Sequence, residues 1–360
     1  MAVDKQTVLA ERMERQGLAR PVTTPDEYSS LFRRLQPVPT IYFAMPGIAP
    51  SLVHRTTFDD MKLNDERRAS REIVKGRFLN GTIGYVFADD LALYGNAFQR
   101  PLERLNSNRK LILDTLRSAG PMTPRRIKEE TGLLNKEIMP ALHRLQEAFL
   151  VYEDQTTGDW ERAWYAFEQM WPDVEISPDL WEPSACEALV RFLRSQVFAG
   201  IEQIRDWSGW ALRDIKRLLE VLEEDGTIVA CEIDELGEGW MLAEDLALDK
   251  KSPVRSVFML HRADPLVRAD ITWLKESFPG LEVLQFLLID GDLQGAVCGH
   301  WRFGPYDVDD IVVYLPEEER ASRRDEIIEA VAWKYHPPEH NILRYNGEPA
   351  GERPPSAECD

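Results

Sequence analysis

The sequence predicts an α+β protein with a helical N-terminal region, two tandem winged-helix domains and a small C-terminal β-sheet or β-barrel domain. Two observations lead to this fold class. A pattern of three helical segments followed by an alternating segment occurs twice, at a constant offset of 77 residues. Residues 253–316 also alternate apolar and polar side chains between glycines, which is typical of strands. A chain of 360 residues has room for two or three such domains.

The N-terminal region, residues 1–108, is expected to begin with two helices. The first lies near residues 6–16 and is closed by Gly17. The second starts at a capping box, in which Thr24 is the N-cap and Glu27 reaches back to it. We expect this helix to end before Pro37, because proline disfavours helical conformation in the residue preceding it.

The rest of this region predicts a stiff connection and a hairpin. Four prolines between residues 37 and 50 favour an extended loop. A charged helix is expected at residues 65–76. The pair Asn80-Gly81 favours the turn of a short hairpin, and a further helix is expected at 89–99.

The repeat needs no gap over more than thirty positions, and aligns Leu116 with Leu193. Two helices joined by a turn and followed by a hairpin are typical of a winged helix. We therefore predict winged-helix domains at residues 109–172 and 173–250, with Asn135 as the N-cap of a third helix in the first. The expected helices are 109–120, 123–132 and 135–149, then 187–196, 201–209 and 211–226, with hairpins at 150–167 and 227–242.

The C-terminal part is expected to form a β-rich domain over residues 251–345. Its final helix is predicted at about 317–333, and the proline-rich acidic tail, 346–360, is expected to be disordered. The predicted strands are 283–293, 295–303 and 309–316.

Charge is distributed unevenly along the chain. The formal net charge of −19 argues against a protein that binds a polyanion over its whole surface. Residues 1–150, however, hold 23 Lys and Arg against 18 Asp and Glu, a net charge of +5, whereas residues 151–360 carry −24. Contact with nucleic acid is therefore expected in the first part only.

Several function classes lack their sequence signatures. The chain has no apolar run long enough to span a bilayer, and its charged start differs from a signal peptide. The four cysteines have no metal-binding spacing, and common nucleotide-cofactor motifs are missing. We expect a cytoplasmic protein without membrane, metal or cofactor. The sequence does not define its oligomeric state.

The order of domains and several short motifs together resemble the AlkZ/YcaQ-type winged-helix DNA glycosylases. Residues 76–85, GRFLNGTIGY, are similar to the family's Arg-Gly-Thr-Leu-His segment, and Asp89-Asp90-Leu91 follows them. Residues 258–265, FMLHRADP, resemble a leucine-rich segment of the family. Residues 290–295, DGDLQG, followed by Trp301-Arg302, resemble its strand-turn-strand near the end.

The resemblance also implies a catalytic pair. In the family a Gln-x-Gln or Gln-x-Asp motif lies on an element that reaches the target nucleotide, and Gln36 occupies its first position here. The second position is Val38, which has no polar group to position water or stabilise the developing sugar cation. Gln36 could equally cap the end of its helix. A carboxylate near in sequence could replace the missing partner: Asp59, Asp60, Asp65 or Glu66.

Candidate DNA contacts are basic or aromatic residues of the first 150. The alternatives are solvated surface charges for the cations and inward packing for the aromatic side chains. In the second copy, Glu220, Glu223, Glu224 and Asp225 would repel a duplex, so that copy is expected to be a packing or protein-contact module. The candidate DNA-binding residues are Arg33, Arg34, Tyr42, His54, Arg55, Arg125, Arg126, Lys128, Lys136 and Arg144.

These observations lead to two functional hypotheses. The first is a DNA-binding protein of this family that excises alkylated or crosslinked bases from duplex DNA as a monofunctional glycosylase. The second is a catalytically inactive relative that binds DNA as a regulatory protein with the same fold. A scaffold that uses its acidic half to contact proteins is a third interpretation.

Overall fold

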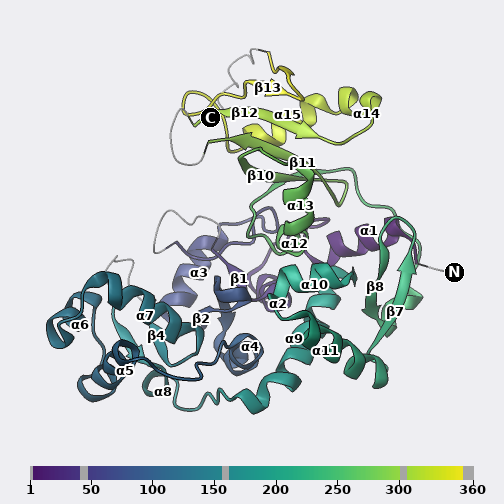
Figure 1. Cartoon of the computed structure of the whole chain (residues 1–360). Helices are drawn as coiled ribbons and strands as arrows, with labels where there is room; N and C mark the ends of the chain where they lie inside the picture. Colours follow the sequence, from purple (N-terminus) through teal and green to yellow (C-terminus); the bar gives the residue numbers. More distant parts are fainter. Residues whose placement is uncertain (1–2, 41–47, 156–161, 301–305, 352–360) are drawn as a thin grey trace. The chain divides into compact units, whose positions relative to one another are not determined.

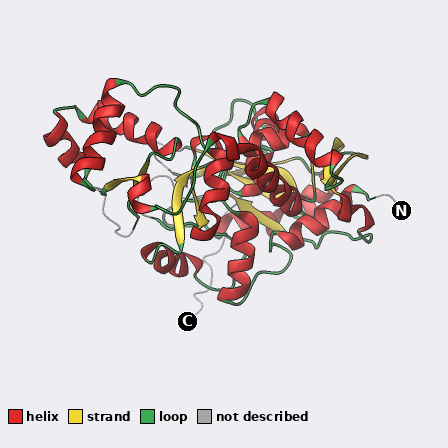
Figure 2. Cartoon of the chain, turned by 90° about the horizontal axis from the view of Figure 1, so that it is seen from below, coloured by secondary structure: helices red, strands yellow, loops and turns green. Residues whose placement is uncertain are grey.

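The computed structural model describes residues 3–40, 48–155, 162–300 and 306–351. The chain divides into two compact units, Met1–Lys250 and Lys251–Asp360. The described residues form both helices and strands (Figure 2), and the α+β fold class is confirmed.

Within the described residues, the N-terminal region combines four α-helices with a small antiparallel sheet of order β1-β3-β2. Both hydrogen bonds of the predicted capping box form at α2, where the Glu27 N–H donates to the Thr24 hydroxyl and Glu27 accepts from the Thr24 N–H. The predicted turn also forms, with Asn80 and Gly81 at positive φ between β2 and β3. The elements are α1 (Lys5–Arg15), α2 (Pro25–Leu35), β1 (Val38–Pro39), α3 (Asp60–Ala69), β2 (Ile73–Arg77), η1 (Leu79–Gly81), β3 (Ile83–Phe87), η2 (Ala88–Asp90) and α4 (Leu91–Phe98).

One prediction for this region was wrong in part. The charged helix ends at Ala69, and Ile73 and Val74 belong to strand β2, where both side chains are fully buried. β-branched residues favour a buried strand over the end of an exposed helix, despite the charges around them. The proline-rich loop begins as strand β1, which pairs with β3 through Val38 and Tyr85.

The two copies of the repeat have helices in the same register. Helices α6 (Pro124–Thr131) and α7 (Asn135–Glu147) lie 77 residues before α10 (Ile201–Ser208) and α11 (Leu212–Glu224) at both ends. The first helices are α5 (Ser107–Ala119) and α9 (Trp181–Gln196), and the hairpins are β4 (Val151–Glu153) with β5 (Trp164–Ala166) and β7 (Ile228–Ile233) with β8 (Gly237–Leu242).

The turns of the two copies also correspond. Gly132 and Gly209 end the second helices at φ of 71° and 73°, the left-handed conformation that glycine adopts without strain. The N-cap of α7 is Leu134 and not Asn135, and its N–H is bound by the Glu137 carboxylate. The expected elements are therefore present, and their identification as winged helices stays a prediction.

Helix α9 holds the first unit together. Its apolar face packs against α4, and it also contacts α1, α2 and β8. Arg12 of α1 donates to the carbonyl oxygens of Gln196, the last residue of α9, and of Phe198, which follows the helix. In Figure 1, α5, α6 and α7 lie at one end of this unit, and α10, α11 and the β7–β8 hairpin lie at the other. The second copy therefore contributes its first helix to the core of the N-terminal region.

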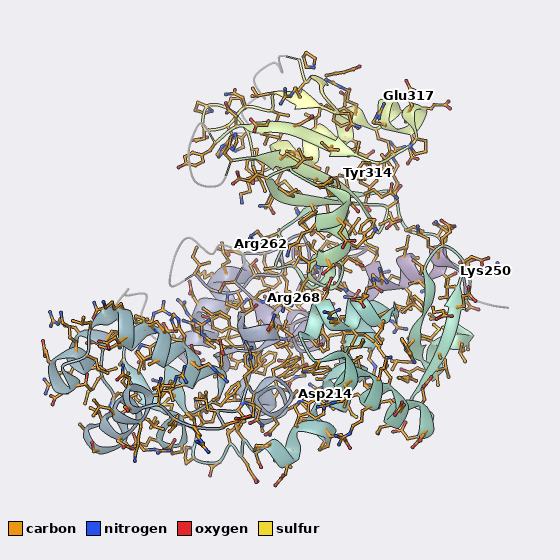
Figure 3. All side chains as sticks on the ribbon, viewed as in Figure 1. Asp214, Lys250, Arg262, Arg268, Tyr314 and Glu317 are labelled. Atoms are coloured by element: carbon orange, nitrogen blue, oxygen red, sulfur yellow. The ribbon has the colours of Figure 1, made fainter. Side chains whose placement is uncertain are left out.

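The second unit contains a six-stranded sheet of linear order β14-β13-β12-β11-β10-β9, so it is an open sheet and not a barrel. Figure 3 labels Tyr314 and Glu317, which lie after β12 and at the start of α14. The elements are β9 (Val257–Leu260), α12 (Pro265–Ala269), α13 (Ile271–Ser277), β10 (Val283–Ile289), β11 (Asp292–Gly299), β12 (Val308–Val313), α14 (Glu317–Ser322), α15 (Arg324–Ala332), β13 (Arg344–Tyr345) and β14 (Glu348–Pro349).

Two predictions for this unit were wrong in part. The final helix is interrupted at Arg323, whose buried guanidinium binds the carboxylates of Asp290 and Glu326. The tail is ordered as far as residue 351, because Glu348–Pro349 pairs with β13. Residues 352–360 lie outside the described part of the chain.

Candidate functional site

Gln36 lies directly after helix α2 and its side chain is buried, with 4% of its surface exposed. Both ends of its amide are bound inside the protein. Nε2 donates to Oδ2 of Asp90 at 2.5 Å, and Oε1 accepts from the backbone N–H of Phe87 at 3.0 Å. The amide is therefore held between β3 and η2.

Asp90 is the carboxylate that the sequence reasoning missed. Besides Gln36, it accepts from Arg33 of α2 at 2.5 Å and from Arg191 of α9 at 3.0 Å. Its two oxygens thus join three segments that are far apart in sequence. The signal was present in Asp89-Asp90, but Arg191, which binds Asp90, lies 101 residues away, which sequence alone cannot reveal.

The carboxylates expected near Gln36 serve another purpose. Asp60 accepts from the hydroxyls of Tyr28 and Ser51 and from the N–H of Leu52, so it fixes the start of α3. Asp59 caps the same helix, and Asp65 binds Arg68. Asp59, Asp60 and Asp65 thus have other partners, and Asp90 takes the position beside the Gln36 amide.

Val38, the second position of the presumed catalytic pair, lies in an apolar core. Its side chain is fully buried among aromatic and aliphatic residues of α2 and the sheet, including Phe32, Tyr85 and Phe87. The site thus has one buried amide and a valine in place of two polar groups that face a substrate.

The ion pairs around Asp90 also set the electrostatics of the site. The Arg33 hydrogen bond lowers the pKa of Asp89, its second partner, at 2.9 Å. Arg191 lies over the ring of Tyr94 at 5.9 Å, and burial raises the pKa of that tyrosine. Both arginines and Asp89 are consequently charged at neutral pH, whereas Tyr94 carries its proton.

A basic cleft of about 440 Å³ lies between α2 and α9. Arg33 and Arg191 connect it to the Asp90 cluster. The lining residues are Ser29, Ser30, Arg33, Arg34, Glu187, Arg191 and Arg194. The lining residues of α2 and those of α9 are far apart in sequence, because α9 belongs to the second copy of the repeat. The cleft could therefore not be predicted from the sequence.

The predicted DNA contacts of the N-terminal region have different surroundings. Arg55 is fully buried, and its guanidinium donates to the carbonyl oxygens of Gln16 and Val53, so it cannot reach a phosphate in this structure. His54 is half-buried at a positive φ. Arg34 is exposed in the cleft. Tyr42 lies outside the described residues.

On the first copy of the repeat, Arg125, Arg126, Lys128 and Lys136 are exposed. They come from α6 and from the first turn of α7. Arg144 has a different role, because it donates to the carbonyl oxygens of Arg100 and Pro101 and fixes the chain between α4 and α5. The structure therefore favours four of the five predicted residues as surface cations.

The described residues were compared with the requirements of a metal-ion cluster and of a membrane-spanning helix. Among those residues, no cluster of three or more His, Cys, Asp or Glu side chains is arranged to hold a metal ion. No described helix combines the length and apolar character needed to cross a membrane.

Comparison with known proteins gives three findings. A family model described as "DNA glycosylase AlkZ-like" matches residues 49–302, well over half of the chain and a range that begins after Gln36 and Val38. No curated protein matches the sequence. Among solved structures, the DNA glycosylase AlkZ of Streptomyces sahachiroi is similar with a TM-score of 0.66 and 13% identity, over 92% of this chain and 97% of that chain. At this identity the structural match shows a shared fold.

Proposed function

Because this chain belongs to the AlkZ-like DNA glycosylase family, we propose that it binds duplex DNA in the cytoplasm without excising bases through Gln36 and residue 38. Membership supports a glycosylase-like role in DNA repair. One observation carries the finer proposal: both ends of the Gln36 amide are bound internally, and Val38 is fully buried.

The chemistry of base excision explains why this observation matters. Cleavage of an N-glycosidic bond develops positive charge on the sugar, and a positioned dipole or carboxylate stabilises it. Valine supplies neither. The oxygen of Gln36 accepts from Phe87 and its nitrogen donates to Asp90, so turning the amide toward a nucleotide would break two buried hydrogen bonds.

DNA binding is assigned to the exposed cations of the first copy. Lys128 and Lys136 have no ion-pair partner within the described residues, whereas Arg126 is bound to Glu130. Unpaired surface lysines release counterions from DNA without first breaking a salt bridge. This part of the proposal agrees with the net charge of +5 over residues 1–150.

A second candidate function is base excision with Asp90 as the acidic partner. It is favoured by the contact of 2.5 Å between Asp90 and the Gln36 amide. A carboxylate there would supply the negative charge that valine lacks. Its ion pairs with Arg33 and Arg191 oppose this role, because they offset its charge and engage both oxygens.

A combined binding and base-release assay tests both candidates on alkylated and crosslinked duplexes. The proposal expects affinity that falls steeply with salt, and no base release above background by the wild-type protein. Release that Asp90→Asn and Gln36→Ala abolish would replace it with the second candidate. No duplex binding at low salt would contradict both.

A further inference from the structure

The described residues that line the cleft between α2 and α9 carry more positive than negative charge. Four arginines line it and one glutamate accompanies them. On each helix, lining residues share one face. Ser30 and Arg34 are four residues apart on α2, and Arg191 and Arg194 are three residues apart on α9.

Two of the four arginines have strong acidic partners. Arg33 binds Asp89 and Asp90 at 2.5–3.0 Å, and Arg191 binds Glu187 at 2.8 Å and Asp90 at 3.0 Å. Their donors are largely used within the protein. This half of the cleft is therefore a structural ion-pair network that fixes α2 against α9.

The other two arginines lack such partners. Arg34 donates to the backbone oxygen of Arg15 at 2.8 Å, and no carboxylate contacts it among the described residues. Within the described ranges, the acidic partner of Arg194 is Glu244, at 3.6 Å between two exposed side chains. Partial desolvation of its guanidinium in the cleft, together with the nearby charges of Arg15 and Arg194, lowers the pKa of Arg34.

We propose that Arg34 and Arg194 form a binding site for a phosphoryl group. The two guanidinium groups bind the anion from two different helices, α2 and α9. This inference rests on the proposed DNA binding, and names the backbone phosphate of bound DNA as the occupant. Guanidinium groups match the oxygens of a phosphate with pairs of donors, and such charge-assisted hydrogen bonds are stronger than neutral ones. A cleft of about 440 Å³ is large enough for a phosphate with part of its sugar.

The Asp90 network gives this site a defined geometry. Arg33 directly precedes Arg34 on α2, and Arg191 precedes Arg194 by about one turn of α9. The carboxylate that Arg33 and Arg191 share holds the two helices at a fixed separation, so Arg34 and Arg194 are positioned before a ligand arrives. Preorganised donors bind an anion at a smaller entropic cost than flexible ones.

The test uses Arg34→Gln, Arg194→Gln and the double variant of the full chain. Arg213→Gln is the matched control, because this side chain is 90% exposed on α11, beside the Asp214 labelled in Figure 3, and lies outside the cleft. Duplex affinity is measured from low to moderate salt. Thermal unfolding is measured with sodium phosphate or pyrophosphate, against chloride at equal ionic strength.

The double variant is expected to weaken duplex binding about tenfold and to reduce the log–log salt slope by about 0.9, the contribution of one phosphate contact. The control keeps the wild-type slope. A stabilising shift by phosphate or pyrophosphate that only the cleft variants lose, with DNA binding unchanged, would support the same site with a free phosphorylated ligand as its source. If neither readout separates the cleft variants from Arg213→Gln, the site is overturned.

These outcomes remain separate from those of the proposed function. A wild-type protein that fails to bind duplex at low salt would contradict the proposed function, and the phosphate measurement would still decide whether the cleft binds an anion. Circular dichroism of each variant establishes that the exposed substitutions leave the fold intact.

Discussion

The two copies of the repeat share a core and differ at the surface of their third helices. Leu142 of α7 and Leu219 of α11 are equivalent and both buried. Toward the end of α7, however, Gln146 is buried and bound by Arg77, whereas its equivalent on α11, Glu223, is exposed. The same local fold therefore faces the N-terminal sheet in one copy and solvent in the other.

This difference assigns separate roles to the copies. The second half of α7 is covered, so the first copy presents α6 and the first turn of α7, where Lys128 and Lys136 lie. The exposed end of α11 carries Glu220, Glu223 and Glu224, which repel a duplex. The second copy instead contributes α9 to the core and to the basic cleft.

The largest expected effects test the shared core. Leu142→Ala and Leu219→Ala each remove a buried side chain at equivalent positions. Each is expected to lower the free energy of unfolding by about 2–5 kcal/mol, because a cavity adds to the lost burial. Urea denaturation measures this. A loss under about 1 kcal/mol in one copy would show that its core is not equivalent to the other.

The next effect tests the junction between α2 and α9. Asp90→Asn removes the charge that Arg33 and Arg191 share, and is expected to destabilise the protein by about 2 kcal/mol, less than a fully buried pair because Arg33 is partly exposed. Asp89→Asn is the matched control. Its side chain is 70% exposed, and a loss below about 1 kcal/mol is expected. Equal losses of unfolding free energy in the two variants would show that Asp90 contributes no more to this junction than Asp89.

DNA binding should separate the equivalent surface cations. Lys128 and Lys136 of the first copy correspond to Arg205 and Arg213 of the second. Lys128→Gln with Lys136→Gln is expected to reduce the salt slope of duplex binding by about 1.8, from two lost phosphate contacts. The pair Arg205→Gln and Arg213→Gln should leave the slope unchanged. A reversed result would assign DNA to the second copy.

The smallest effect concerns His143 on the covered face of α7. Burial and the nearby Arg77 lower its pKa in the folded protein. The unfolded state therefore takes up the proton first, and stability is lost as the pH falls below about 6.5. The loss is expected to stay below about 0.5 kcal/mol, because the ring is only half-buried. Comparing the pH dependence of the unfolding free energy between wild type and His143→Gln isolates the contribution of this histidine. An identical pH dependence would mean that this face of α7 is solvated and leaves the pKa of His143 unchanged.

Local patterns carried most of the fold prediction. The capping box at Thr24, the turn at Asn80-Gly81 and the repeat could be predicted because their signals lie within a few residues, or recur at one offset. Strand β2 was missed because Ile73 and Val74 follow a charged helical run. Only its pairing with β3 shows the strand.

The site could be predicted only in part. Gln36 was identified from the sequence, but its partner Asp90 is 54 residues away and Arg191 is 101 residues from that carboxylate. The sequence predicts Arg55 as a surface cation, but its guanidinium is buried and donates to the backbone oxygen of Gln16. Long-range ion pairs depend on packing between elements, which no local pattern encodes.

The most direct test of the central claim is single-turnover base release from an alkylated duplex by excess wild-type protein, with binding verified in the same sample. The proposed function predicts bound DNA with no abasic sites above the protein-free control. Base release above that control by the bound wild-type protein would contradict it, and loss of this release in Gln36→Ala with duplex binding retained would assign the chemistry to that amide.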